Sequence, residues 1–137
     1  PSYFFSSIQR RNLMNPKDIM QKYFICFERG DWEDFRNLHS HNVIVHLNGI
    51  HKLSGRYSGF TDFMDNLVSK ISTIFPKNFS VTPLKMIHED NEIFIHATVL
   101  ADRLEAYFAY RATIENGKIT KLWIYSDSQK LANSFQT

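Results

Sequence analysis

DIMQKYFICFERGDWEDFRNLHSHNVIVHLN, residues 18–48, is the stretch that decides the fold. Its apolar side chains recur at helical spacing over 19–27, which predicts an amphipathic helix. Gly30 ends that helix, and the aromatic pattern over 32–38 predicts a second, shorter one. The β-branched run at 43–47 then predicts the first strand of a sheet.

The next part of the chain predicts a loop and a long helix. Residues 48–59 contain three glycines and are interpreted as a loop. Over residues 60–75 the apolar side chains follow the i, i+3, i+4, i+7 rule of a helix with one buried face. Pro76 ends this third helix.

The remainder is typical of antiparallel strands. Asn116-Gly117 is a strong signal for a two-residue hairpin of type I′. Pro83 assigns its strand to a sheet edge or to a bulge, because proline cannot donate to a ladder. Residues 126–135 are interpreted as a short helix or a tail. The four expected strands are 79–88, 93–101, 105–114 and 119–125.

This order predicts an α+β domain in which a curved antiparallel sheet wraps around three N-terminal helices. The apolar faces of the helices need a partner, and the sheet supplies it. A chain of 137 residues suits a single core, so residues 15–137 are expected to form one domain. Residues 1–14 are expected to be a poorly ordered N-terminal arm.

Composition and charge argue against several classes of function. The net charge is +2 and the densest basic run is Arg10-Arg11, which is too little clustering for nucleic-acid binding. No apolar run approaches the roughly 18 residues of a membrane span. Cys26 is the only cysteine, so no intrachain disulfide forms, and no Cys/His pair has zinc-site spacing. We therefore expect a cytoplasmic protein without a metal or another cofactor.

Several short motifs are specific in combination. Together they resemble the nuclear transport factor 2-like superfamily, in its SnoaL-like and ketosteroid-isomerase-like branch, over about residues 16–129. The matching segments are MQKY at 20–23, RGDW at 29–32, GRYSGF at 55–60, NGKI at 116–119, and LW at 122–123 followed by Asp127.

The resemblance implies a cone with an apolar cavity at its wide end and a homodimer through the outer face of the sheet. Members include isomerases, polyketide cyclases, dehydratases and non-catalytic binders, so the fold does not decide the function. The expected partner is a hydrophobic small molecule. The expected chemistry is acid/base isomerase, cyclase or dehydratase chemistry on a carbonyl compound. The alternatives are a non-catalytic ligand-binding module and a structural subunit of a larger complex.

Ketosteroid-isomerase chemistry carries over badly onto this sequence. Tyr23 falls where the family has its tyrosine donor, but the position of the base falls on Leu47 and that of the acid on Ala109. The resemblance to SnoaL-like cyclases is better at Asp127, which matches their trailing acidic residue.

Three residues are the catalytic candidates. His96 is the candidate base, since its ordinary pKa is near 6.5, although a satisfied structural histidine is an equal alternative. Asp127 is the candidate acid, although it would also serve as the N-cap of a last helix. Tyr23 is the candidate hydrogen-bond donor, with a core tyrosine as its alternative.

Further residues are expected to line the pocket. The family register turns Tyr107 and Arg111 inward, where Arg111 would suit a carboxylate or an enolate; alternatively it pairs with Glu105 or Asp127. Four histidines, at 39, 41, 46 and 51, are interpreted as solvated surface residues and not as a metal cluster. The predicted pocket residues are Leu47, Arg56, Tyr57, Tyr107, Arg111 and Trp123.

Overall fold

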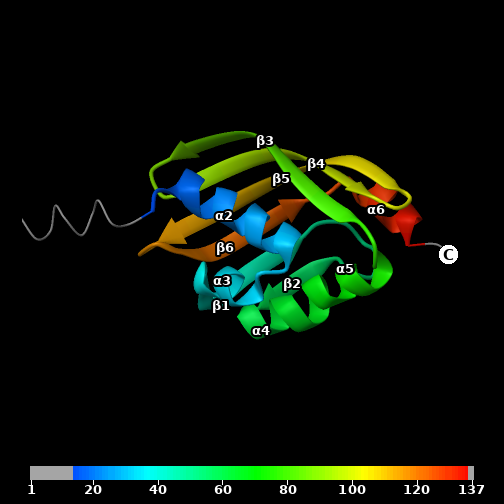
Figure 1. Ribbon diagram of the computed structural model, residues 1–137, viewed down its shortest axis with the longest axis horizontal. Coiled ribbons are helices and arrows are strands. Elements are labelled where there is room, and N and C mark those ends of the chain that lie inside the picture. The colour runs from blue at the N-terminus through cyan, green and yellow to red at the C-terminus, as the bar shows by residue number, and fades with distance from the viewer. Residues whose placement is uncertain (1–13, 136–137) are drawn as a thin grey trace, which may run out of the picture.

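Helix α2 (Pro16–Arg29) forms where the apolar pattern predicts it. At its start the Asn15 side chain accepts a hydrogen bond from the Asp18 amide at 2.9 Å, and proline occupies the first helical position. Gly30 ends the helix with a φ of 72°, a left-handed conformation that glycine adopts without strain. The buried face of α2 packs against the sheet, as Figure 1 shows.

The computed structural model describes residues 14–135; the expectation for the arm therefore falls almost entirely outside the described residues. It confirms the α+β architecture, and no helix in 14–135 is long and apolar enough to cross a membrane. After α2 the elements are α3 (Trp32–Asn37), β1 (His39–Leu47), β2 (Gly55–Ser58), α4 (Phe60–Phe63), η1 (Met64–Val68), α5 (Ser69–Ile74), β3 (Phe79–Glu89), β4 (Glu92–Ala101), β5 (Leu104–Glu115), β6 (Lys118–Tyr125) and α6 (Ser128–Ser134).

The six strands form one sheet in the order β2-β1-β6-β5-β4-β3. The predicted four-stranded meander is confirmed, and β1 joins it through a parallel pairing with β6. Strand β3 lies at an edge and shifts register between Pro83 and Lys85, as its proline predicts. Asn116 and Gly117 have φ values of 52° and 74°, as a type I′ hairpin requires.

Three local predictions need correction. The 48–59 segment is not all loop, because Gly55–Ser58 forms β2 and pairs with β1. Strand β1 begins at His39, four residues before the β-branched run. The long helix over 60–75 is interrupted by the π-helical segment η1.

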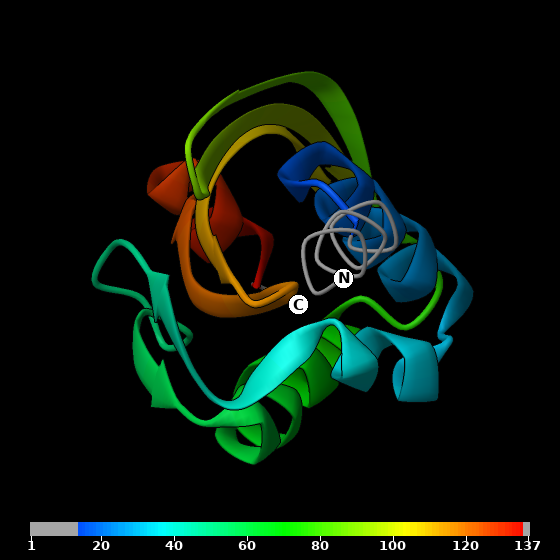
Figure 2. The same ribbon diagram turned by 90° about the vertical axis from the view of Figure 1, so that its left-hand side faces the viewer.

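The sheet is strongly curved, and α2 and the α4–η1–α5 helix lie on its concave side (Figure 2). Inward side chains of the strands meet the apolar faces of these helices and form one core. Alternate residues of β4, β5 and β6 point to the convex side, which we call the outer face. The concave side therefore holds the core, and the outer face is turned away from it.

Candidate functional site

An apolar cavity of about 40 Å³ lies between the helices and the concave side of the sheet. Its walls come from α2, α4, η1, α5 and α6, from strands β1, β3, β5 and β6, and from the connection between β1 and β2. The volume is close to that of one water molecule in the liquid, about 30 Å³, so side chains fill most of the cone interior. The lining residues are Tyr23, Phe24, Phe27, Leu47, Leu53, Phe63, Leu67, Val68, Ile71, Phe79, Val81, Phe108, Tyr110, Ile124 and Leu131.

Two tyrosines are the polar side chains in this lining. Burial, with a smaller effect of Tyr110, holds the pKa of Tyr23 well above its ordinary value. Burial likewise raises the pKa of Tyr110. The ring of Phe24 packs edge to face on both, with centroids 5.0 Å from Tyr23 and 5.1 Å from Tyr110. Both phenols stay neutral at physiological pH, so each can donate a hydrogen bond.

The side chains that keep some exposure mark where this cavity approaches solvent. Phe27, Ile71 and Phe79 are half-buried, whereas most of the lining is fully buried. The rings of Phe27 and Phe79 meet edge to face, with centroids 6.1 Å apart. We infer from this exposure that these three side chains form the cavity's entrance.

Two of the predicted site residues line the cavity, and one supports it. Tyr23 and Leu47 contribute to the wall. Tyr57 points inward and donates from its hydroxyl to the carbonyl oxygen of Leu53 at 2.5 Å, and Leu53 is itself a lining residue. Tyr57 therefore positions part of the wall.

The other predicted pocket residues lie on the outer face. Tyr107 is 63% exposed, and Arg111 and Trp123 oppose each other in the β5–β6 register on that face. Arg56 is exposed on β2, opposite His46. The inward placement predicted for Tyr107 and Arg111 is wrong, because the neighbouring set that includes Phe108 and Tyr110 faces the core.

Arg111 has partners other than the predicted ones. Its guanidinium donates to the Glu92 carboxylate at 2.5 and 2.8 Å, and not to Glu105 or Asp127. It also lies over the indole of Trp123, with 4.6 Å from Cζ to the ring centroid. The other side chain stacked on Trp123 is His46, with ring centroids 5.6 Å apart.

The three catalytic candidates do not meet in one cavity. His96 is exposed on the outer face beside Tyr107, with ring centroids 5.3 Å apart, whereas Tyr23 lines the interior cavity. Asp127 caps α6 by accepting from the Lys130 amide at 3.1 Å. The predicted arrangement of base, acid and donor around one ligand is therefore wrong. The same register turns Ala109, which falls on the isomerase acid position, away from the interior.

His39 contradicts its interpretation as a solvated surface residue. It is only 5% exposed and is enclosed by the rings of Tyr23, Phe35, Phe60 and Phe63, with centroids 4.7 to 5.8 Å away. Burial lowers its pKa to about 4, against the opposing effect of its hydrogen bond to Phe35. The sequence signal for this placement is weak, because residues 39–42 look like a turn.

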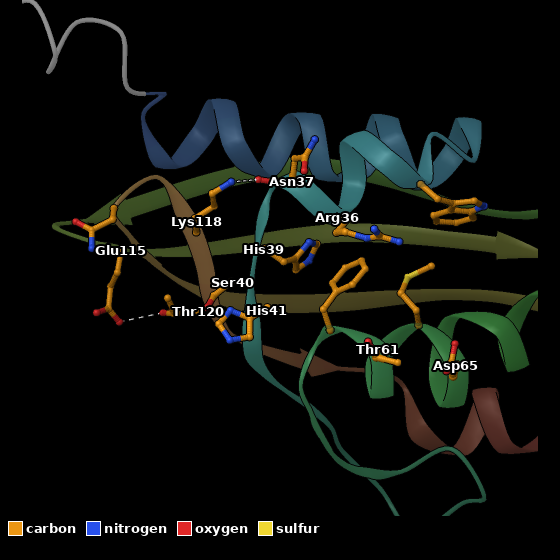
Figure 3. Close-up of a pocket in the computed structure, with 14 residues that line it drawn as sticks. Arg36, Asn37, His39, Ser40, His41, Thr61, Asp65, Glu115, Lys118 and Thr120 are labelled. Atoms are coloured by element: carbon orange, nitrogen blue, oxygen red, sulfur yellow. Dashed lines mark hydrogen bonds between the residues drawn. The ribbon is translucent and has the colours of Figure 1, made fainter.

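A second recess, of about 990 Å³, opens at the end of the molecule that carries the β5–β6 turn (Figure 3). We call it the groove; it is bounded by α3, the start of β1, the α4–η1 helix and that turn. His39 belongs to its lining, and the groove and the cavity share no lining residue. Within residues 14–135 there is no group of three or more His, Cys, Asp or Glu side chains placed to hold a metal ion.

Known structures share this architecture. Bal32a, from a soil-derived mobile gene cassette, superposes with a TM-score of 0.82 at 14% identity, covering 88% of this chain and 95% of its own. An NTF2-like protein from Burkholderia thailandensis superposes with a TM-score of 0.82 at 11% identity, covering 91% of this chain and 100% of its own. TerC, co-crystallised with polyporic acid, superposes with a TM-score of 0.78 at 16% identity, covering 88% of this chain and 97% of its own.

The sequence itself carries the family assignment. No curated protein sequence matches the chain significantly. The family model described as a SnoaL-like domain matches residues 20–122, from the middle of α2 to β6. This range includes most of α2, the α3 and α4–η1–α5 helices, the cavity walls on β1 and β5, and the Asn116-Gly117 turn, whereas α6 lies beyond it. The chain therefore belongs to the SnoaL-like domain family.

Proposed function

We propose that this chain binds a hydrophobic small molecule with a hydrogen-bond acceptor, such as a ketone, in the interior cavity. The observation that carries the proposal is the pair of neutral tyrosine hydroxyls, Tyr23 and Tyr110, in an otherwise apolar lining. Small-molecule sites combine an apolar wall with a few placed polar groups in this way. A carbonyl oxygen would accept from one or both phenols.

Binding is favoured over turnover. Proton abstraction beside a carbonyl needs a base within hydrogen-bond reach of the substrate. The described lining of the cavity contains no carboxylate, imidazole or amine. Because their pKa values are raised, both tyrosines stay protonated at neutral pH, so each can donate a hydrogen bond but neither is available as a base. This supports the non-catalytic module over an isomerase, cyclase or dehydratase.

The cavity has to enlarge to take such a ligand. Typical ligand pockets occupy roughly 300–1,000 Å³. Rotation of Phe27, Ile71 and Phe79 at the entrance would open the interior without breaking a hydrogen bond of the sheet. TerC, which has the same fold, was co-crystallised with the organic compound polyporic acid. That precedent supports an organic ligand in this architecture.

The test compares two ligands that differ only in the acceptor. α-Tetralone and tetralin share one bicyclic skeleton, and only the first has a carbonyl. We expect the wild-type chain to bind α-tetralone about five- to tenfold more tightly, the factor that one net hydrogen bond supplies. Titration calorimetry gives both affinities, and methyl shifts of Leu67 and Ile71 report the location.

Two variants complete this test. The double substitution Tyr23→Phe and Tyr110→Phe removes both hydroxyls and leaves the rings, so the preference for the ketone should fall to about one. Tyr107→Phe is the matched control, since it removes a hydroxyl from the outer face. Equal affinities of the wild type for the two ligands, or no saturable binding of either, would refute the proposal.

We also propose that the outer face forms a homodimer interface. Its apolar side chains lie on adjacent strands, and Phe94 and Tyr107 are 52% and 63% exposed. Contiguous exposed patches of this kind mark interaction surfaces, and aromatic residues are enriched in interface cores. The residues that make up this patch are Phe94, His96, Tyr107, Trp123 and Tyr125.

Light scattering on a size-exclusion column tests the dimer. The wild type should have twice the chain mass, and Phe94→Glu with Tyr107→Glu should have the mass of one chain, because buried carboxylates disfavour association. Ile25→Glu, which adds a charge at an exposed position of α2, should leave the dimer intact. A wild-type monomer at micromolar concentration would contradict the proposal.

A further inference from the structure

The groove is large, open and mixed in chemistry. Its volume of about 990 Å³ lies at the upper end of typical ligand sites. Trp32, Phe60 and Met64 supply apolar surface from α3 and from the α4–η1 helix. Arg36 and Lys118 are balanced in the same lining by two carboxylates, Asp65 and Glu115. A lining without a net formal charge favours a neutral ligand over an ion.

His39 carries an unused acceptor in this lining. Its Nδ1 lies 2.7 Å from the carbonyl oxygen of Phe35. A carbonyl only accepts, so Nδ1 bears the proton and the neutral ring presents a lone pair at Nε2. Within residues 14–135 this buried Nε2 has no hydrogen-bond partner. Unpaired buried groups of this kind are costly, and few occur in a folded domain.

Two backbone irregularities occur in elements that line the groove. The pairing of β1 with β6 shifts register between His39 and Ile44, and such bulges re-aim side chains near functional sites. The π-helical segment η1 begins at Met64, and its first two residues line the same groove as His39. π-Helical turns are rare and are frequent at functional sites. Both features are independent of the unpaired nitrogen.

One groove side chain packs directly on His39. The ring of Phe60 lies on the imidazole with centroids 5.0 Å apart, and Met64, four residues further along the same helix, also lines the groove. Methionine is unbranched and adapts to irregular contacts. Its backbone belongs to the π-helical turn and is not held in a regular α-helical ladder. A ligand that approaches Nε2 from the groove would have to displace the Phe60 ring, because that ring packs on the imidazole.

We propose that the groove is a second binding site, separate from the interior cavity, for a neutral aromatic compound that bears a hydroxyl group. The ligand's O–H donates to Nε2 of His39, and its ring rests on Trp32, Phe60 and Met64. An anionic ligand is disfavoured at Nε2 of His39, because both the anion and this nitrogen only accept hydrogen bonds. The cavity offers donors and the groove offers an acceptor, so the two sites select opposite hydrogen-bonding groups.

The experiment again uses a matched pair of ligands. β-Naphthol donates a hydrogen bond, and its methyl ether does not. We expect wild-type protein to bind β-naphthol about five- to tenfold more tightly than the ether in titration calorimetry. His39→Phe, which keeps a ring in this aromatic surrounding, should reduce that ratio to about one. Tyr110→Phe should leave the ratio unchanged.

Nitrogen-15 NMR of the wild type provides a readout that does not depend on any variant folding. With histidines labelled, the Nε2 resonance of His39 should move upfield when β-naphthol is added and stay in place with the ether. No shift at saturating β-naphthol, or no saturable binding, would overturn the proposal. Tighter binding of β-naphthoate than of β-naphthol would also overturn it and would assign the groove to anions at Arg36 and Lys118. Loss of the preference in Tyr110→Phe alone would place the ligand in the interior cavity.

Discussion

The buried imidazole of His39 should make folding stability depend on pH. Its pKa in the folded protein is about 4, because burial and the charge of Lys118 disfavour the protonated ring more than the Phe35 hydrogen bond favours it. In the unfolded chain the pKa is near 6.5. Between these values the unfolded state binds more protons than the folded state. The contribution of the neutral His39 ring to folding stability is therefore complete above about pH 6.5 and is lost as the pH falls toward 4.

The size of this loss follows from the two pKa values. Folding stability should fall by about 2 kcal/mol between pH 7 and pH 5, and by about 3 kcal/mol at pH 4. His39→Phe removes the titrating group from a site already enclosed by aromatic rings. At pH 7 the free energy of unfolding of the variant should lie within about 2 kcal/mol of the wild-type value, because the variant loses one hydrogen bond but also loses the unpaired nitrogen.

Urea unfolding followed by circular dichroism measures the effect. Wild type and His39→Phe should be compared at pH 7, 6 and 5, and the quantity of interest is the difference between their free energies of unfolding. The lowered pKa of His51 affects both proteins equally and cancels. We expect the variant to gain about 2 kcal/mol relative to the wild type on going from pH 7 to pH 5. Parallel pH profiles would refute the reasoning, since they would mean that His39 is protonated as easily in the folded protein as in the unfolded chain.

Three further predictions concern stability. Asp127→Ala should cost about 1 kcal/mol in urea unfolding by removing the cap on the Lys130 amide, while Asp127→Asn should retain most of it. Gly30→Ala should lower the free energy of unfolding by about 1 kcal/mol, because a residue with a Cβ is strained at a φ of 72°. The new Cβ would make only ordinary contacts with Trp32, so no steric clash adds to this cost. A neutral result would contradict the left-handed conformation of Gly30. Phe35→Ala should cost about 3–5 kcal/mol, since the ring is fully buried among Tyr23, His39, Phe60 and Phe63; a loss below about 2 kcal/mol would show that the surrounding rings collapse into the space.

The sequence predicts the helices and the meander because those signals are local. The apolar spacing along α2 and along residues 60–75 needs no tertiary information, and the Asn116-Gly117 turn requires only two residues. Strand β2 was missed because Gly55–Ser58 is short and glycine-led, and it exists through its pairing with β1. A four-residue strand has no periodicity that distinguishes it from a loop.

The sequence did not predict correctly which strand residues point to the core and which point to the outer face. Strand β5 alternates two sets of residues, and both contain a tyrosine, so alternation alone does not say which set is buried. Tyr110 faces the cavity and Tyr107 faces outward, and a one-residue change of register exchanges them. His39 was missed for a related reason: its burial depends on a register shift in the β1–β6 pairing.

The parallel pairing of β1 with β6 has a consequence for how the chain folds. It joins residues 39–47 to residues 119–124, and the Ile119 amide donates to the carbonyl oxygen of Leu38 at 2.8 Å. Contacts between segments so distant in sequence close late, since the intervening chain must first lose its conformational entropy. During synthesis, β1 cannot complete its pairing with β6 until β6 has left the ribosome. Until then the nascent chain exposes an unpaired strand edge, and we expect chaperone binding to be strongest in that interval.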